Sequence, residues 1–199
     1  IKPILFNTEM VRAILDGRKT CTRRVIELPE NMDGVPVGKS GDSSNPLGFM
    51  YPGGIKRPPY QPGDILYVRE TWCALPVNEA GHMRGHSIYY YRADGDLRPE
   101  GWRGKWRPSI HMPKEAARIW LKVTNVRVER LQEITIDGIR NEGISSMAVH
   151  AGDMEIALKE WKNLWNSTIK KTDLDSYGWE ANPWVWVIEF ERCEKPEGV

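Results

Sequence analysis

The segment RIWLKVTNVRVERL, residues 118–131, constrains the fold most, because apolar and polar side chains alternate along it. A period of two is typical of a β-strand that buries one face in a core. The residues expected in that core are Ile119, Leu121, Val123, Val126 and Val128. The chain is therefore expected to contain at least one long strand whose alternate side chains pack inward.

Three further segments have strand patterns. Residues 61–72 begin with a Pro-Gly turn and then alternate, residues 87–93 are rich in tyrosine, and residues 182–192 are rich in β-formers. Because Pro183 cannot donate a hydrogen bond to a ladder, it is expected at the beginning of the last strand.

Helical patterns separate these strands. A first helix is expected to end at Gly17, with Asn7 or Thr8 as its N-cap. A second is expected to begin after Thr135 and to stop at Gly143. A third should cover residues 153–168, with its two tryptophans on the core face.

The order of these elements indicates the fold class. Strands occur in blocks, helices are interspersed, and neither an internal repeat nor a βαβ rhythm is present. This order predicts a single α+β domain over residues 1–199, built on a small mixed sheet or barrel flanked by helices. Two stretches with few periodic apolar positions, approximately residues 27–61 and 73–116, are expected to be long irregular insertions.

Composition excludes some classes of protein. The 28 cations and 27 anions leave a net charge of +1, so a surface that is basic throughout is excluded and any basic patch must be local. Three cysteines without a CxxC pair fit a reducing compartment. No apolar run approaches the roughly 18 residues of a membrane span, and no signal peptide is visible, so we expect a cytosolic protein without a membrane partner.

The segment GRKTCTRR, residues 17–24, is the strongest candidate for a functional site. Four cations, two hydroxyls and a thiol follow directly after the first helix, and such a cluster suits a polar ligand. In an extended path alternate side chains share a face. One face is expected to carry Lys19, Cys21 and Arg23, and the other Thr20, Thr22 and Arg24. The alternative is a solvated basic loop that complements the negative end of the preceding helix.

Glu142 is a distant partner for this cluster. It lies in the last turn of the second predicted helix, where a carboxylate opposes the helix dipole. This mildly unfavourable position indicates a cationic partner nearby.

Several segments together resemble the ASCH family. They are ILDGRKTCTRRV, QPGDILYVRETW, the RIWLKVTNVRVERLQEI segment that leads into IRNEGI, and the terminal NPWVWVIEFE. They extend over the chain from Ile4 to Arg192, and their sequences are most similar to those of members from bacteriophage and prophage genomes. The resemblance implies a PUA-like β-barrel covered by helices, with a cleft where the GRKT segment lies. The two insertions have no counterpart in the smallest members.

The resemblance also implies an activity. PUA-like relatives commonly bind RNA or modified bases, some small ASCH proteins are amidohydrolases that remove the acetyl group of acetylcytidine, and others are ribonucleases. Where the amidohydrolases have their Lys, Thr and Glu, this chain has Lys19, Thr22 and Glu142, which are therefore the catalytic candidates. The expected substrate-binding cations are Arg18, Arg23 and Arg24, the last at the family's trailing basic position.

Two chemistries are open for these residues. Amide hydrolysis needs a nucleophile, a base and an acid, and Thr22, Lys19 and Glu142 could each supply one role. Cys21 ranks below Thr22 as a nucleophile, because no histidine lies close in sequence. A neutral Lys19 beside Thr22 would support hydrolysis, whereas a charged Lys19 paired with Glu142 would support electrostatic binding. No cofactor and no metal are expected, since no acidic metal-ligand cluster is evident.

Two other groups are candidates for the rim of the cleft. One is an aromatic and basic stretch, which could stack bases and neutralise phosphates. Its residues are Arg98, Trp102, Arg103, Lys105, Trp106 and Arg107. We favour the alternative, an insertion loop whose two tryptophans pack back onto the domain. The other group is Glu70 and Trp72, for which a scaffold role, with Glu70 paired to an arginine, is the favoured interpretation.

The sequence thus predicts a protein that binds a nucleoside, or single-stranded or structured RNA, with hydrolysis as the leading activity. The alternatives are a non-catalytic RNA-binding module and a phage accessory protein that recruits an unknown protein partner. Binding without turnover would favour the module, and an exposed Trp patch away from the cleft would favour the accessory protein.

Overall fold

The computed structural model describes residues 1–29, 32–39, 41–42, 47–76, 87–101 and 104–198. The chain divides into two compact units, each assembled from separate segments. Unit 1 comprises Ile1–Asp16, Ile65–Leu121 and Arg192–Val199, and unit 2 comprises Gly17–Asp64 and Lys122–Glu191. The expectation of one domain over residues 1–199 stays a prediction.

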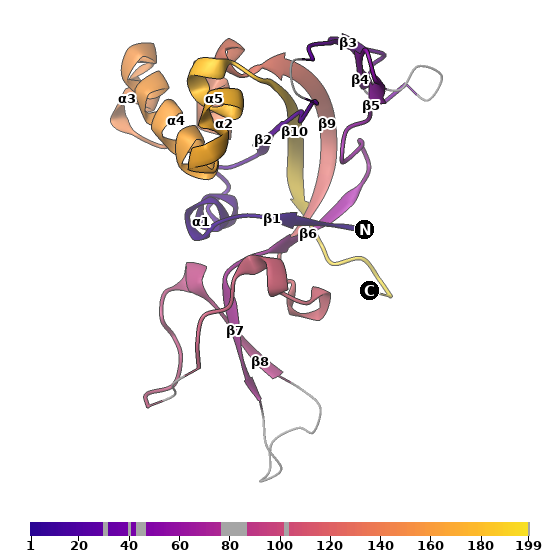
Figure 1. Ribbon diagram of the computed structural model, residues 1–199. Coiled ribbons are helices and arrows are strands. Elements are labelled where there is room, and N and C mark those ends of the chain that lie inside the picture. Colours follow the sequence, from indigo (N-terminus) through magenta and orange to yellow (C-terminus); the bar gives the residue numbers. More distant parts are fainter. Residues whose placement is uncertain (30–31, 40, 43–46, 77–86, 102–103, 199) are drawn as a thin grey trace. The chain divides into compact units, whose positions relative to one another are not determined.

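Unit 1 is built from short strands and helical turns (Figure 1). Its strands are β1 (Lys2–Leu5), β6 (Ile65–Arg69), β7 (Trp72–Pro76) and β8 (Ser87–Tyr91), and its α-helix is α1 (Thr8–Leu15). Strands β1 and β6 pair in parallel, and β7 and β8 pair antiparallel. Three 3-10 turns follow, at Arg92–Asp94, Ser109–His111 and Lys114–Ala116.

The predicted first helix is confirmed with its caps. The Asn7 side chain accepts a hydrogen bond from the Met10 amide at 2.8 Å, which satisfies one of the free donors at the N-terminus of α1. Gly17 follows the C-cap with a φ of 74°, a left-handed conformation that glycine adopts without strain.

Unit 2 contains most of the longer strands. They are β2 (Cys21–Val25), β3 (Val35–Val37), β4 (Gly48–Tyr51), β5 (Gly54–Lys56), β9 (Trp120–Arg130) and β10 (Trp184–Cys193); β9 begins, and β10 ends, with residues of unit 1. Within unit 2 the order is β9-β10-β2, with β10 and β2 antiparallel. A separate antiparallel sheet has the order β3-β4-β5.

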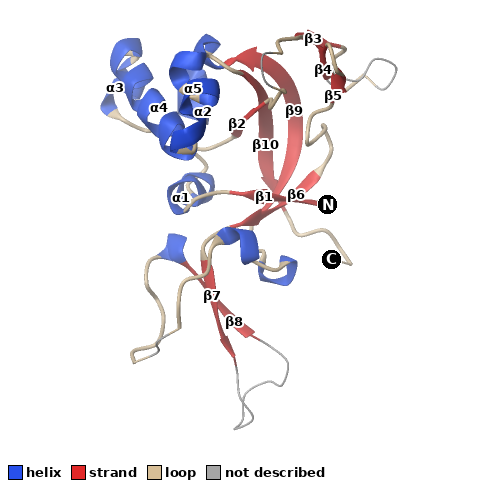
Figure 2. Cartoon of the chain, viewed as in Figure 1, coloured by secondary structure: helices blue, strands red, loops and turns tan. Residues whose placement is uncertain are grey.

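Four helices of unit 2 gather on one side of β2, β9 and β10 (Figures 1 and 2). They are α2 (Ile136–Asn141), α3 (Met147–Ala151), α4 (Met154–Thr168) and α5 (Leu174–Tyr177), with 3-10 turns at Leu131–Glu133, Lys171–Asp173 and Trp179–Ala181. Trp161 and Trp165 of α4 are buried in a core that includes Val185 and Val187 of β10. The prediction that these tryptophans belong to the core is confirmed.

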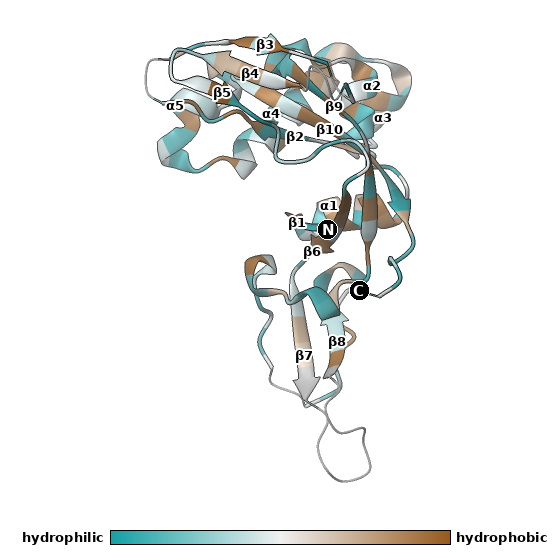
Figure 3. Cartoon of the chain, turned by 90° about the vertical axis from the view of Figure 1, so that its right-hand side faces the viewer, coloured by the Kyte–Doolittle hydropathy of each residue, from teal (hydrophilic) through white to brown (hydrophobic). Residues whose placement is uncertain are grey.

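The long alternating segment forms β9 as predicted, and Figure 3 colours the chain by hydropathy. Four of its five expected core residues are buried, and Val128 is half-buried. The strands expected within residues 61–72, 87–93 and 182–192 are also present. The α+β class is confirmed, although no pairing among the described strands closes a barrel.

The expectation of two irregular insertions is wrong in part. Residues 27–61 contain β3, β4 and β5, and residues 73–116 contain most of β7, all of β8 and three 3-10 turns. These strands have only three to five residues, too few to show a period, and the glycines between them form turns. Among the described helices, none combines the length and the apolar character required to cross a membrane.

Candidate functional site

Backbone hydrogen bonds hold the GRKTCTRR segment between two elements of unit 2. The Thr20 amide donates to the carbonyl oxygen of Asn141 in α2, and the Thr20 carbonyl accepts from the Phe190 amide of β10, both at 2.9 Å. Lys19 and Glu142 form an isolated antiparallel bridge beside these bonds. The segment is therefore part of the fold and is not a solvated loop.

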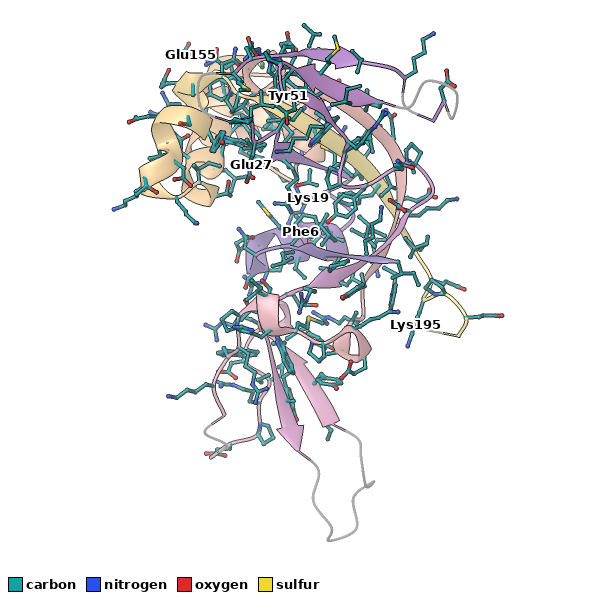
Figure 4. The ribbon with its side chains drawn as sticks, turned by 45° about the vertical axis from the view of Figure 1, so that its right-hand side comes forward. Phe6, Lys19, Glu27, Tyr51, Glu155 and Lys195 are labelled. Carbon is teal, nitrogen blue, oxygen red and sulfur yellow. The ribbon has the colours of Figure 1, made fainter. Side chains whose placement is uncertain are left out.

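Lys19 and Glu142 form a buried ion pair. Both residues are at most 4% exposed, and Figure 4 labels Lys19. The Lys19 Nζ donates to Glu142 Oε2 at 2.5 Å and to the Glu142 carbonyl oxygen at 3.0 Å. Glu142 is the C-cap of α2, so the prediction of a cationic partner at this helix end is confirmed.

Arg23 is the second cation on Glu142. Its Nη1 donates to Glu142 Oε1 and its Nη2 to Glu129 Oε2, both at 3.1 Å. The guanidinium also lies 5.9 Å from the ring centroid of Trp161 and 3.8 Å from the Cys21 sulfur. Cys21 and Arg23 thus share a face of β2, and both Lys19 and Arg23 contact Glu142 from that side, as the alternation predicts.

These contacts extend into a network of six charged side chains. Arg127 of β9 donates to Glu129 at 2.5 Å and also to Glu189 of β10. We call this set the ion network: Lys19, Arg23, Arg127, Glu129, Glu142 and Glu189. Because three cations meet three carboxylates, the network is balanced internally.

The contacts of Glu142 with two cations compensate for the burial of these charges. An isolated charge is costly to bury, and removal of one partner leaves the other uncompensated. Since an ammonium and a guanidinium both donate to Glu142, the charged forms of all three groups compensate one another. Of the two chemistries considered for Lys19, the contacts fit the charged lysine paired with Glu142.

Cys21 is poorly suited to nucleophilic chemistry. Burial, with a further contribution from the Glu142 carboxylate, raises the pKa of the Cys21 thiol to about 12. The thiolate is the reactive form of cysteine, so Cys21 stays protonated and inert near neutral pH.

Thr22 and Arg24 lie on the opposite face of β2 from Cys21 and Arg23. In the antiparallel register Thr22 faces Ile188 and Arg24 faces Trp186. Thr22 is 2% exposed. The structure therefore brings Lys19, Arg23 and Glu142 together, and it places Thr22 and Arg24 on the other side of the strand.

A pocket of about 270 Å³ opens beside the Lys19–Glu142 bridge. We call it the Arg18 pocket. It is lined by Gly17, Arg18, Thr20, Arg140, Asn141, Ile144, Ser145 and His150. Two guanidinium groups, two hydroxyls, an amide and an imidazole thus surround it, and no carboxylate is among these lining residues.

Local contacts fix several of these side chains. Arg18 Nη1 donates to the Gly143 carbonyl oxygen at 2.5 Å, while Arg140 donates to Asp137 and, at 3.3 Å, to the Val149 carbonyl oxygen. The His150 Nδ1 lies 2.7 Å from the Ser146 carbonyl oxygen, which can only accept, so we assign the proton to Nδ1. The neutral ring then offers Nε2 as an acceptor.

Within this lining set, the sequence patterns identified Gly17, Arg18 and Thr20, which belong to the GRKTCTRR segment. Arg140 carries a usable signal, because it lies two residues before Glu142 in the same helical turn. Asn141, Ser145 and His150 have no pattern that would distinguish them from ordinary surface residues. Their convergence depends on the turn between α2 and α3.

Glu70 and Trp72 belong to unit 1 and have structural partners there. Arg118 donates to both carboxylate oxygens of Glu70, at 2.9 and 3.1 Å. Burial raises the pKa of Glu70, and the Arg118 hydrogen bonds oppose that effect. Trp72 is 4% exposed and packs against Met112. These contacts agree with the scaffold interpretation.

The aromatic and basic stretch also lies in unit 1. The guanidinium groups of Arg92 and Arg98 each lie over the Trp106 ring, at 5.4 and 4.7 Å from its centroid. Arg107 lies 5.2 Å from the Trp72 ring, and Lys105 is exposed. Trp102 and Arg103 are outside the described residues. Trp106 thus packs back onto its own unit, as the favoured alternative states.

Neither a search for metal-binding groups nor comparison with known proteins assigns a function to the site. Within the part of the chain that the structure describes, no group of three or more His, Cys, Asp or Glu side chains is placed to hold a metal ion. Comparison of the chain with models of protein families, with curated proteins and with solved structures found no match. The resemblance to the ASCH family therefore rests on its sequence segments.

Proposed function

We propose that unit 2 binds a nucleoside unit of RNA in the Arg18 pocket, without a covalent step. The observation that carries this proposal is the pocket itself, in which Arg18 and Arg140 converge with uncharged polar groups on a rigid buried base. The resemblance to a family that includes RNA-binding members directs the choice of ligand.

The chemistry of the pocket matches the parts of a nucleotide. Guanidinium groups bind phosphate oxygens through paired hydrogen bonds. Thr20, Ser145 and His150 offer hydroxyl and imidazole groups for base edges or a 2′-hydroxyl, and Ile144 offers an apolar surface for a base. A volume of about 270 Å³ is close to the lower end of small-ligand pockets.

The ion network supports this pocket by holding its two walls together. Lys19 lies between Arg18 and Thr20 of one wall, and Glu142 follows Arg140 and Asn141 of the other. The Lys19–Glu142 pair therefore links the two walls. In this proposal Lys19 and Glu142 are positioning residues.

Hydrolysis of acetylcytidine or RNA by Lys19, Thr22 and Glu142 is the competing proposal. The contacts of Lys19 with Glu142 favour binding without turnover. The accessory-protein alternative gains no support, because no tryptophan is among the exposed large hydrophobic residues of the described chain.

A PUA-like fold and a cytosolic location belong to the same proposal. The α+β composition of unit 2 supports the first. The second is supported by Cys21, Cys73 and Cys193, which are free thiols, as expected in a reducing compartment.

The test is binding of fluorescently labelled single-stranded RNA, followed by anisotropy at several salt concentrations. We expect Arg18→Gln and Arg140→Gln each to weaken binding by roughly tenfold, as expected when a charge-assisted hydrogen bond is lost. Each should also reduce the salt slope by about 0.7, the value for one phosphate contact on a single strand. Lys159→Gln removes an exposed cation from α4 and is the matched control.

Equal weakening by Lys159→Gln would show that only net charge matters, and the proposal would fail. It would also fail if wild-type protein bound neither RNA nor nucleosides. Turnover of acetylcytidine that Thr22→Val abolishes while binding persists would establish the hydrolase instead.

A further inference from the structure

We propose a second binding site in unit 2, specific for a phosphoryl group, on the face of β2 that carries Thr22 and Arg24. A pocket of about 180 Å³ lies there, and we call it the Arg24 pocket. Its lining residues are Arg24, Val25, Glu27, Lys56, Arg57, Pro59 and Trp186. It shares no lining residue with the Arg18 pocket.

Three cations from two chain segments converge on this pocket. Arg24 comes from β2, while Lys56 ends β5 and Arg57 follows it. Lys56 donates to the backbone carbonyl oxygen of Glu27, which ties the end of β5 to the segment after β2. Glu27, labelled in Figure 4, is the one carboxylate among the lining residues, so the cations outnumber it three to one.

The position of Arg24 gives the pocket a rigid base. Arg24 pairs in register with Trp186 of β10, whose side chain is 3% exposed and lines the same pocket. Burial lowers the pKa of Arg24, which means that the surroundings disfavour its charge, and the interaction with Tyr60 opposes this effect.

The size and charge of the site select its ligand. A volume of about 180 Å³ is below the range for a drug-sized ligand, so the pocket suits a compact tetrahedral anion. Two guanidinium groups and an ammonium provide the fork-shaped and point donors that phosphoryl oxygens accept. The phosphoryl group can come from free phosphate, a nucleotide or an RNA strand, and the chemistry of recognition is the same.

The experiment monitors the tryptophan indole N–H signals by NMR while inorganic phosphate, cytidine monophosphate or a short RNA is added at constant ionic strength. The Trp186 signal is assigned with Trp186→Phe. We expect phosphate and cytidine monophosphate to shift this signal, whereas cytidine does not. Lys56→Gln and Arg57→Gln should each weaken phosphate binding by roughly tenfold, while Lys159→Gln leaves it unchanged.

The outcomes separate this site from the proposed function. Phosphate binding that survives Arg18→Gln but not Arg57→Gln supports the Arg24 pocket, even if RNA binding at the Arg18 pocket fails. A larger effect from RNA than from the mononucleotide identifies a strand as the source of the phosphoryl group. The proposal is overturned if chloride shifts the Trp186 signal as phosphate does, if the signal does not move, or if Lys159→Gln weakens binding as much as Arg57→Gln.

Discussion

Replacement of Glu142 by glutamine should destabilise the protein strongly, because Glu142 neutralises two buried cations. Its carboxylate accepts from Lys19 at 2.5 Å and from Arg23 at 3.1 Å. Hydrogen bonds to charged groups contribute about 1.5–3 kcal/mol each, and breaking one partner of a buried ion pair costs about 3–5 kcal/mol. The glutamine oxygen retains part of these bonds, so we expect the free energy of unfolding to fall by about 3 kcal/mol.

Urea denaturation followed by tryptophan fluorescence measures this loss. Glu155→Gln is the control, since Glu155 is an exposed carboxylate in the first turn of α4, where removal should cost less than about 1 kcal/mol. The double variant with Lys19→Met and Glu142→Gln removes both charges of the pair. It should lose less stability than the sum of the single variants, by at least about 1 kcal/mol.

A loss below about 1 kcal/mol in Glu142→Gln would refute the reasoning, because the network would then not depend on the carboxylate charge. Strict additivity in the double variant would refute the direct coupling of Lys19 with Glu142. A strong loss that couples to Lys19 would show that the Lys19–Glu142 pair stabilises the fold.

Three further predictions concern single groups. Thr22→Val should leave RNA affinity within about twofold of wild type, because Thr22 is buried and is not among the residues that line the Arg18 pocket, and a larger loss in the anisotropy assay would contradict this expectation. Cys21 should resist iodoacetamide in the native protein at pH 8, where its thiol is protonated, and mass spectrometry should detect its modification only after unfolding. Burial raises the pKa of Tyr91 to about 12 from its ordinary value near 10, so the native state keeps a proton that the unfolded state loses. Stability should therefore fall between pH 10 and 12 by about 3 kcal/mol at most, and Tyr91→Phe should flatten that part of the denaturation profile; an unchanged profile would contradict the prediction.

Periodic patterns predicted the parts of the fold that are long enough to show a period. Strand β9 and helix α4 span eleven and fifteen residues, and most of the core positions expected in β9 and both tryptophans of α4 are buried. The same method missed β3, β4 and β5, which have three or four residues each. In such short strands the pairing partner and the turns determine the conformation, and neither is visible in a local pattern.

The candidate site was also predicted only in part, where a local sequence signal was present. A carboxylate at the C-terminal end of a helix was enough to indicate a cation near Glu142, and the structure supplies Lys19 and Arg23. The sequence could not show that Arg140 and His150 line the same pocket as Arg18, because the turns that bring them together have no periodic pattern. Alternation along β2 puts Thr22 on the other face from Arg23, which conflicts with a simple Lys–Thr–Glu cluster.

The alternation of β2 also explains how a chain with a net charge of +1 can present two basic pockets. Of the four cations in the GRKTCTRR segment, Lys19 and Arg23 point to one side and are neutralised by carboxylates of α2 and β9. Arg18 and Arg24 instead line the two pockets, which contain one carboxylate residue between them. Lys19 and Arg23 are thus neutralised inside unit 2, while cations outnumber carboxylates among the lining residues of the two pockets. Local charge at this segment, and not the net charge of the chain, is therefore the quantity that should control the binding of anions.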